Sequence, residues 1–501
     1  MKQLSPETPP PFQIEQQIWL KALLLFFGSF LLYFLSRSPG LDEIDSINFA
    51  MGVGEYNLWK HQPQPPGYPL FVFLGYIGRI LFGADANTAL HFVSAMGGGL
   101  LVAAWFVTIR VQFNERLAWW VAGCLAVTPI VWMISTKVMT DTLASGLLSA
   151  QILAAVCFAQ SGQRRWLIAT GVLGAAAAAG RPGLALVVFV VLTTTLVKGP
   201  KIPRGWWIGW MTLVGSSLIW LIPLWYTQWR LRPPAVATEA VYPHLVYNYW
   251  AGRLHSPNVF LFAGKWTAEY LATRFVFHIL GWFGLGFGFI QSAAIFFAGT
   301  AIALVGLAAY ILGQKQPADG RFWRFHAPWA LVHITLIFIN VPAHQRYYLV
   351  IYPLLLVSLL SGYLRWRQPW NRLAWSFPAL LLCVTIPCAI VNHRDPSPPL
   401  RFLHYLEELH PRAERGRVVL LLTTKVKRHA EWYAPEFVTI NPIPPPEQLP
   451  ELTKNAVAVY TDDPYAPLPP KWYRVPLVTF TRSLIVYWKG HYLELYLVER
   501  P

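Results

Sequence analysis

Long apolar runs separated by short polar loops dominate the chain. Crossing a bilayer takes a helix of about 20 apolar residues, and eleven runs come close to that length. They lie near residues 18–35, 89–108, 117–135, 141–160, 166–180, 183–197, 205–226, 287–312, 327–342, 347–363 and 374–391. The pattern predicts a mostly α-helical, polytopic membrane protein with about eleven transmembrane helices.

Basic residues gather in every second loop, which predicts the orientation. The five basic loops are 110–116, 164–165, 198–204, 315–324 and 365–372. The positive-inside rule places such loops in the cytoplasm. The apolar run Tyr68–Phe82 is short and interrupted by glycines and Arg79, so we interpret it as a non-spanning surface helix. This choice leaves the N-terminus cytoplasmic.

The remaining loops are then expected to share one extracytoplasmic face. These segments are the first loop 36–88, the loop 136–141, Arg181, the long loop 227–274, the loop 342–346 and the chain after 392.

The composition changes near residue 393, where charges and prolines become frequent. Short β-type runs at 418–422, 456–460 and 492–498 alternate with helical patterns, among them an amphipathic stretch at 401–409. We therefore expect a transmembrane domain over 1–392 and a soluble extracytoplasmic α/β domain over 393–501, a usual size for an independent unit.

Composition supports the membrane class and excludes others. The 501 residues include 40 Lys+Arg against 24 Asp+Glu, for a net charge of +16, yet only 13 % are charged and 55 % are hydrophobic. Soluble domains are about a quarter charged. The basic residues lie in small groups between apolar runs, so they indicate topology and not nucleic-acid binding. The four cysteines lie inside apolar stretches without metal-ligand spacing.

Three carboxylates, Asp42, Glu43 and Asp45, follow directly after the first span. Acids at a membrane edge are costly unless they have partners or a function. An ordinary role is also open, since Asp45 could cap a helix that starts directly after it. His61 and the proline-rich segment 62–69 come next, and prolines lower the entropy lost when a loop is ordered.

The first loop resembles the opening signature of membrane glycosyltransferases with the GT-C fold. Asp45-Ser46, Phe49-Ala50 and the segment Pro65-Pro66-Gly67-Tyr68-Pro69-Leu70 are most similar to a bacterial branch with a GDS…FA…HPPGYPLY pattern. The similarity is more distant to protein O-mannosyltransferases and aminoarabinose transferases, whose acidic pair Asp42-Glu43 resembles. Ile44 stands where the pattern has Gly, and Gln64 where it has His. The residues leave open whether Asp45 or Asp42/Glu43 is the working acid.

Three further segments match the family in order. They are KVMTDT at 137–142, GRPG at 180–183 and HQRYYLVIYP at 344–353. Together with the first loop they lie on the one predicted extracytoplasmic face.

The resemblance implies transfer of a sugar from a polyprenyl-phosphate donor to a protein, lipid or glycan acceptor outside the cytoplasm, in a bacterial inner membrane. An acceptor hydroxyl needs a base, and the leaving phosphate needs cations, for which Arg is suited by its planar fork. The expected catalytic residues are Asp45, Asp42 and Glu43, the expected phosphate ligands are Arg346, Arg181 and Lys137, and the other expected pocket residues are His61, Tyr68, Asp141, His344 and Tyr347.

Simpler roles stay open for several of these residues. The basic side chains could anchor helix ends at lipid headgroups, and Asp141 could cap its helix. The acids and His61 could hold a divalent cation, but the resemblance implies a metal-independent enzyme, so no cofactor is expected. The competing functions are a transporter or flippase of a polyprenyl-linked glycan and a non-catalytic scaffold. A transporter is disfavoured because no internal repeat is evident and the acids cluster at one edge.

Overall fold

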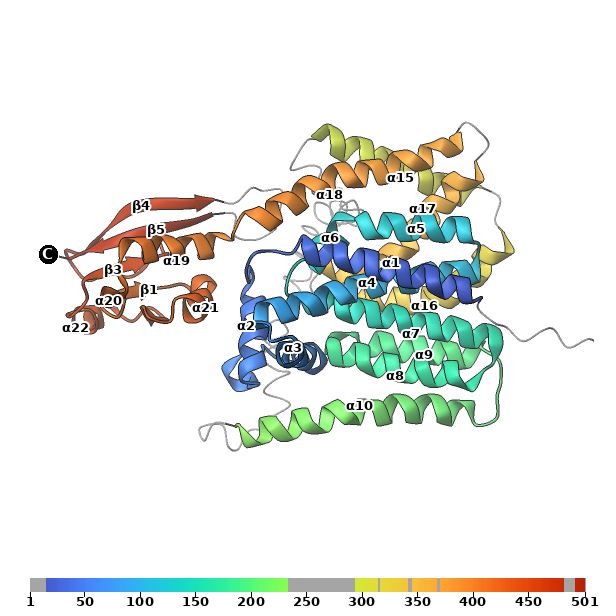
Figure 1. The fold of residues 1–501 in the computed structure, drawn as a ribbon, viewed down its shortest axis with the longest axis horizontal. Coiled ribbons are helices and arrows are strands. Elements are labelled where there is room, and N and C mark those ends of the chain that lie inside the picture. The colour runs from blue at the N-terminus through green and yellow to red at the C-terminus, as the bar shows by residue number, and fades with distance from the viewer. Residues whose placement is uncertain are drawn as a thin grey trace, which may run out of the picture.

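A bundle of apolar helices forms the main body, and a smaller α/β unit extends from one end of it (Figure 1). The computed structural model describes residues 15–232, 293–313, 316–340, 345–366, 370–481 and 492–500. The described bundle helices are α1 (Gln16–Leu35), α4 (Ala86–Gln112), α5 (Glu115–Val127), α6 (Pro129–Ser135), α7 (Thr140–Ser161), α8 (Arg164–Gly180), α9 (Ala185–Lys198), α10 (Gly205–Arg230), α15 (Ala293–Leu312), α16 (Pro317–Asn340), α17 (Tyr352–Arg365) and α18 (Ser376–Arg394).

Shorter elements connect these helices. They are α2 (Ile44–Gly54), η1 (Leu58–Lys60), α3 (Pro69–Phe82), η2 (Pro182–Leu184), η5 (Gln345–Val350) and η6 (Trp370–Trp375). The short apolar run after Tyr68 is α3. Helix α2 begins at Ile44, so Asp45 lies in its first turn and is not its cap, which Glu43 occupies.

Each predicted span coincides with a helix or with two consecutive helical segments over the part that the structure describes. Among the described residues, five helices are long and apolar enough to cross a membrane, or up to seven if each bent pair counts as one span. One pair, α5 and α6, bends by 57°. The bend falls at Thr128, which precedes Pro129 and is therefore held in an extended conformation. The count of eleven crossings stays a prediction.

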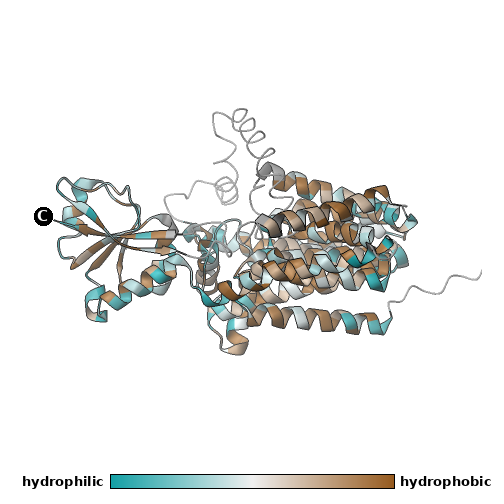
Figure 2. Cartoon of the chain, turned by 90° about the horizontal axis from the view of Figure 1, so that it is seen from above, coloured by the Kyte–Doolittle hydropathy of each residue, from teal (hydrophilic) through white to brown (hydrophobic). Residues whose placement is uncertain are grey.

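The outer helices expose large apolar side chains. Helix α1 exposes Leu20, Leu24 and Leu35, and α10 exposes Trp207 and Ile219. Apolar residues prevail along the bundle, as Figure 2 shows. A surface of this extent is stable in a bilayer and unfavourable in water.

The centre of the bundle is a close crossing of α4 and α7. A methyl group at Gly97 would overlap the backbone of Leu143, so the approach requires glycine. Hydrogen bonds fix the crossing: Thr142 Oγ1 donates to Ser94 O over 2.9 Å, and Ser94 Oγ donates to Met139 O over 3.1 Å. The crossing thereby fixes the loop that leads into α7.

The loops are sorted between the two ends of the bundle. At one end Lys198 donates to Arg324 O, and Gln112 bonds His326 at 2.9 Å. At the other end Ser38 N donates to Thr136 O over 3.0 Å. These described segments lie at the ends that the prediction gives them, although most of the predicted loop 315–324 is part of α16. The side of the membrane that each end faces stays a prediction.

The α/β unit contains a five-stranded sheet among its described residues, in the order β2-β1-β3-β5-β4. Its elements are α19 (Pro398–Leu409), α20 (Arg412–Arg415), β1 (Val418–Leu421), α21 (Thr424–Tyr433), β2 (Val438–Ile440), η7 (Pro446–Gln448), α22 (Leu449–Leu452), β3 (Ala458–Thr461), β4 (Tyr473–Thr481) and β5 (Tyr492–Glu499). Strand β1 is parallel to β2 and β3, and β5 is antiparallel to β3 and β4.

Both faces of this sheet are covered. Helices α19 and α21 pack on one face, where Phe402 and Val426 contact the side chains of Val418 and Leu420. Leu449 covers the other face. Strand β1 is buried on both faces, which explains its uninterrupted apolar run. The amphipathic stretch at 401–409 is part of α19, although its last residue, Leu409, is exposed.

Candidate active site

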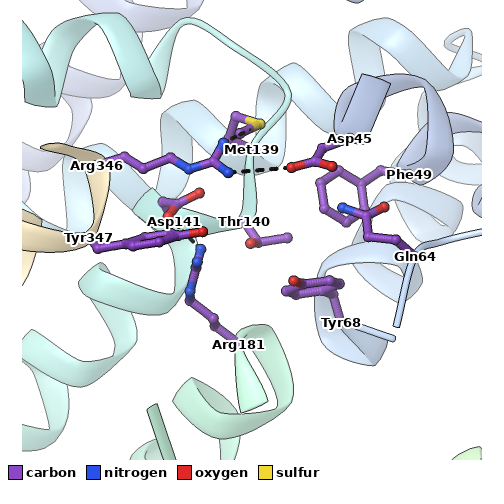
Figure 3. Close-up of a pocket in the computed structure, with 10 residues that line it drawn as sticks. All are labelled: Asp45, Phe49, Gln64, Tyr68, Met139, Thr140, Asp141, Arg181, Arg346 and Tyr347. Atoms are coloured by element: carbon purple, nitrogen blue, oxygen red, sulfur yellow. Dashed lines mark hydrogen bonds and ion pairs between the residues drawn. The ribbon is translucent and has the colours of Figure 1, made fainter. Parts of the chain in front are cut away.

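A cavity of about 80 Å³ lies at the end of the bundle that carries the α/β unit. Four separate segments of the chain supply its walls, as Figure 3 shows. The lining residues are Asp45, Phe49, Gln64, Tyr68, Met139, Thr140, Asp141, Arg181, Arg346 and Tyr347. The structure thus brings together six of the predicted site residues, which are Asp45, Tyr68, Asp141, Arg181, Arg346 and Tyr347.

Two ion pairs cross the charged side of the cavity. Arg346 Nη2 lies 3.4 Å from Asp45 Oδ2, and Arg181 Nη1 pairs with Asp141 Oδ1. The ring of Tyr347 contacts both cations, with its centroid 4.3 Å from the Arg181 guanidinium carbon and 5.3 Å from that of Arg346. Two positive and two negative groups therefore line the cavity, and their charges sum to zero.

Local backbone geometry orients these side chains toward the cavity. Asp141 lies in the first turn of α7, where a carboxylate also interacts favourably with the helix dipole. Arg181 follows α8 in an extended conformation that directs it away from the helix axis. Arg346 and Tyr347 are on η5. Each side chain belongs to a helix end, so the packing of the bundle fixes their relative positions.

The electrostatic environment of Asp45 favours the protonated form of its carboxyl. Burial raises the pKa of its carboxyl above the ordinary value; Arg346 opposes the rise, and Glu43 and Asp141 add to it. Its side chain keeps 38 % of its surface accessible, and it lines the cavity. A carboxylate with a raised pKa that a substrate can reach is suited to accept a proton.

The remaining predicted acids form a separate cluster. Lys137 Nζ lies 3.6 Å from Asp42 Oδ2 and 3.8 Å from Glu43 Oε1. Asp42 also accepts from Ser38 Oγ over 2.9 Å. Lys137 is 4 % exposed, so its charge is held by these acids, and none of the three residues lines the cavity. This arrangement joins the first loop to the segment that leads into α7.

Of the two predicted histidines, only His61 is among the described residues, and it does not line the cavity. His61 is exposed and caps the C-terminal end of η1 with a φ of 56°. A bridge between Asn57 and Gln62 closes the turn that contains it. His344 lies outside the described residues, as does the long loop from residue 233 onward.

Four lining residues were not predicted: Phe49, Gln64, Met139 and Thr140. Phe49 follows Asp45 by one helical turn, a spacing that places both on one face of α2. Met139 and Thr140 directly precede Asp141 in the matched KVMTDT segment. Gln64 occupies the family's histidine position, so its place in the motif was a usable signal.

Tyr68 contributes an aromatic wall in a strained conformation. Its φ is 51°, which is uncommon for a bulky residue. The ring packs edge-on against Phe49, with centroids 5.3 Å apart. The preceding Gly67, with a φ of 117°, accepts a hydrogen bond from Tyr56 Oη over 2.8 Å. Packing therefore holds Tyr68 where it lines the cavity.

No group of three or more His, Cys, Asp or Glu side chains in the described part of the chain is arranged to hold a metal ion. The expectation that no cofactor is used stays a prediction.

Comparison with known proteins supports the interpretation of the fold. The family model described as dolichyl-phosphate-mannose-protein mannosyltransferase matches residues 63–229, which include Gln64, Asp141 and Arg181 but not Asp45. The protein O-mannosyl-transferase tmem260 of Dictyostelium discoideum is 26 % identical over 118 residues, which are 22 % of this chain and 14 % of that protein. The matched segment thus spans only a small part of this relative.

Two solved structures share the architecture. The apo structure of ArnT from Cupriavidus metallidurans superposes with a TM-score of 0.51 at 13 % identity, covering 96 % of this chain and 98 % of that one. The apo oligosaccharyltransferase of Archaeoglobus fulgidus also gives 0.51 at 13 % identity, covering 89 % and 69 %. The chain is an integral membrane protein with the GT-C fold. The resemblance to membrane glycosyltransferases predicted from the sequence is confirmed.

Proposed function

We propose that the protein transfers a sugar from a polyprenyl-phosphate donor to an acceptor hydroxyl on the extracytoplasmic side of the membrane. The observation that carries the proposal is the pairing of Asp45 with Arg346 across one cavity. A base and a phosphate-binding cation are the two groups that this reaction requires. The family model, which is named for a dolichyl-phosphate-linked sugar, supports the class of donor.

In the proposed step, Asp45 accepts the proton of the acceptor hydroxyl. The acceptor oxygen forms a bond to C1 of the sugar, and the bond between C1 and the phosphate oxygen breaks. The electron pair leaves on the phosphate, where Arg346 and Arg181 stabilise the developing negative charge. Because Arg346 lowers the pKa of Asp45, a phosphate that draws Arg346 toward itself also makes Asp45 a stronger base.

We assign the sugar to the opposite wall of the cavity. Phe49, Gln64 and Tyr68 lie across from the arginines in Figure 3, and small-molecule sites combine apolar surface with a few polar groups. Gln64 Oε1 is buried and has no hydrogen-bond partner among the described residues. The Gln64 side chain lines the cavity, and its amide is a polar group on this wall for a hydrogen bond to a sugar hydroxyl.

The test is mass spectrometry of lipid extracts from cells that carry the wild-type protein, no protein or Asp45→Asn. We expect one polyprenyl-phosphate sugar to accumulate in the null strain and in the Asn strain. Asp85→Asn is the matched control, because this exposed carboxylate caps α4 and Asn caps equally well.

Other outcomes decide between the alternatives. Accumulation in the null strain alone would move the base away from Asp45 or indicate a flippase. If the donor lipid accumulates in neither strain, the proposed transfer from a polyprenyl-phosphate donor is wrong, and the non-catalytic scaffold becomes the favoured hypothesis.

A further inference from the structure

Helix α21 of the α/β unit lies against the first loop of the bundle. The two segments are far apart in the chain, since 392 positions separate Leu41 from Tyr433. The contacts come from the adjacent residues Arg428 and His429 and from Tyr433, which is one helical turn after His429. Trp432 and Tyr433 also pack against the apolar cluster that contains Leu41 and Phe49.

Three of these contacts reach backbone atoms of the first loop. Leu41 N donates to Tyr433 Oη over 2.7 Å, and His429 Nε2 lies 3.3 Å from Asp42 O. Arg428 Nη2 donates to Lys60 O over 2.7 Å. The first two contacts lie just before α2, and the third lies just after it. Helix α21 therefore holds the chain on both sides of the helix that carries Asp45.

The fit before α2 is close. A methyl group at Gly40 would come within 2.7 Å of Leu400 Cδ2 and 3.1 Å of Tyr433 Oη. His429 is 1 % exposed, so its contact with Asp42 O is shielded from water. Burial raises the pKa of Tyr433 to about 12, so the hydroxyl keeps its proton. The α/β unit and the first loop therefore form a closely packed, buried interface.

A different element holds the other side of the loop. Leu58 N donates to Gln228 Oε1 over 2.9 Å, and Trp59 Nε1 donates to Gln228 O over 3.1 Å. Gln228 is near the end of α10 and is fully buried. Helix α10 thus anchors the η1 turn, whereas Leu41 and Asp42, just before α2, are held by α21 and by the Lys137 cluster.

We propose that the α/β unit is a brace for α2, and that Tyr433 and Arg428 are positioning residues for Asp45. A displacement of about 1 Å in a catalytic group can lower a rate by about a hundredfold. The mechanical part of this proposal stands on the contacts alone. Its catalytic consequence rests on the proposed function.

The mechanical part is tested by hydrogen exchange of the full-length protein in detergent, without substrate. Tyr433→Phe keeps the ring and removes the hydroxyl, and Arg428→Ala removes the contact with Lys60 O. Each is expected to speed exchange in residues 41–54 about fivefold, the ratio that corresponds to one hydrogen bond of typical net strength. Exchange in α4 and α7 is expected to stay unchanged.

Two control variants isolate the contact. Lys60→Ala keeps the backbone oxygen that Arg428 binds and removes only an exposed side chain paired with Glu55. Tyr473→Phe removes a hydroxyl that bonds Glu499 on the exposed edge of the sheet. Both should leave the exchange of α2 unchanged. Unchanged exchange in both Tyr433→Phe and Arg428→Ala would overturn the brace.

The catalytic consequence has its own readout. In Tyr433→Phe we expect turnover about tenfold lower, measured as accumulation of the donor lipid in cells, with unchanged binding of undecaprenyl phosphate to the purified protein. Faster exchange with normal turnover would overturn the positioning role of Tyr433. Because exchange is measured without substrate, a wild-type protein that shows no transfer would contradict the proposed function and not the brace.

Discussion

Arg346 and Asp45 are 301 positions apart in the chain, yet Nη2 of the arginine lies 3.4 Å from Oδ2 of the aspartate. The pair joins the element that follows α16 to the first loop, and it closes one side of the cavity. Arg346 is 11 % exposed, so its charge acts in surroundings where water screens it weakly. This pairing makes the acid–base properties of Asp45 dependent on Arg346.

The pH dependence of turnover should therefore respond to the neighbours of Asp45 with opposite signs. The base works deprotonated, so turnover should rise as pH rises through its pKa. Arg346 lowers this pKa and Glu43 raises it. We expect Arg346→Gln to move the acidic limb of the pH–rate profile to higher pH, and Glu43→Gln to move it to lower pH. Shifts in the same direction would assign the limb to another group.

Arg346 should also contribute to donor binding. A hydrogen bond to a charged group is worth about 1.5–3 kcal/mol, so Arg346→Ala is expected to weaken binding of undecaprenyl phosphate about 10- to 100-fold. Acceptor binding should change less. Arg79→Ala, which removes an exposed arginine from α3, is the control for loss of charge at the membrane surface. Equal losses for Arg346→Ala and Arg79→Ala would reassign Arg346 to a structural role.

Gln64 should affect recognition of the sugar and leave recognition of the phosphate unchanged. Gln64→Ala removes the side-chain amide that lines the cavity, and losing one hydrogen bond should lower kcat/KM for the donor by about fivefold. Gln64→His places the family's residue at this position and should retain more activity. Binding of undecaprenyl phosphate, which carries no sugar, should be the same in all three proteins.

Removing one member of the Arg181–Asp141 ion pair should destabilise the fold more than removing both. Asp141 is 4 % exposed and Arg181 15 %. Removing one partner of a buried pair leaves an uncompensated charge, at a typical cost of about 3–5 kcal/mol. We expect Asp141→Ala to lower the thermal midpoint in detergent, and the double variant Asp141→Ala/Arg181→Ala to recover part of the loss. A double variant less stable than Asp141→Ala would argue against this coupling.

The crossing of α4 and α7 gives a prediction about packing. Gly97→Ala would place a methyl group against the backbone of Leu143, and overpacking of this kind costs about 1–3 kcal/mol. Gly123→Ala is the matched control, because Gly123 is on a helix with no atom within 4 Å of the added carbon. It should be neutral or slightly stabilising, since alanine favours helix over glycine. Thermal unfolding in detergent distinguishes the two.

The sequence determined which segments become helices, because a long apolar run has one stable form in a bilayer regardless of its neighbours. It also placed Asp45, Asp141, Arg181 and Arg346 at helix ends on one face, since the alternation of basic loops is a local property of the chain. The start of helix α2 was harder to predict from the sequence, because the helix begins before Asp45 and not after it.

Only the tertiary structure decided which charges meet. Lys137 pairs with Asp42 and Glu43 instead of lining the cavity, and Arg181 pairs with Asp141. Partner choice between residues far apart depends on how helices cross, and a crossing is set by close contacts such as that of Gly97 with Leu143. The contact between Tyr433 and Leu41 likewise joins two segments that no local sequence pattern predicts to be neighbours. Local patterns therefore fixed the helices, whereas long-range packing selected Asp45, among three neighbouring acids, as the one that faces the cavity.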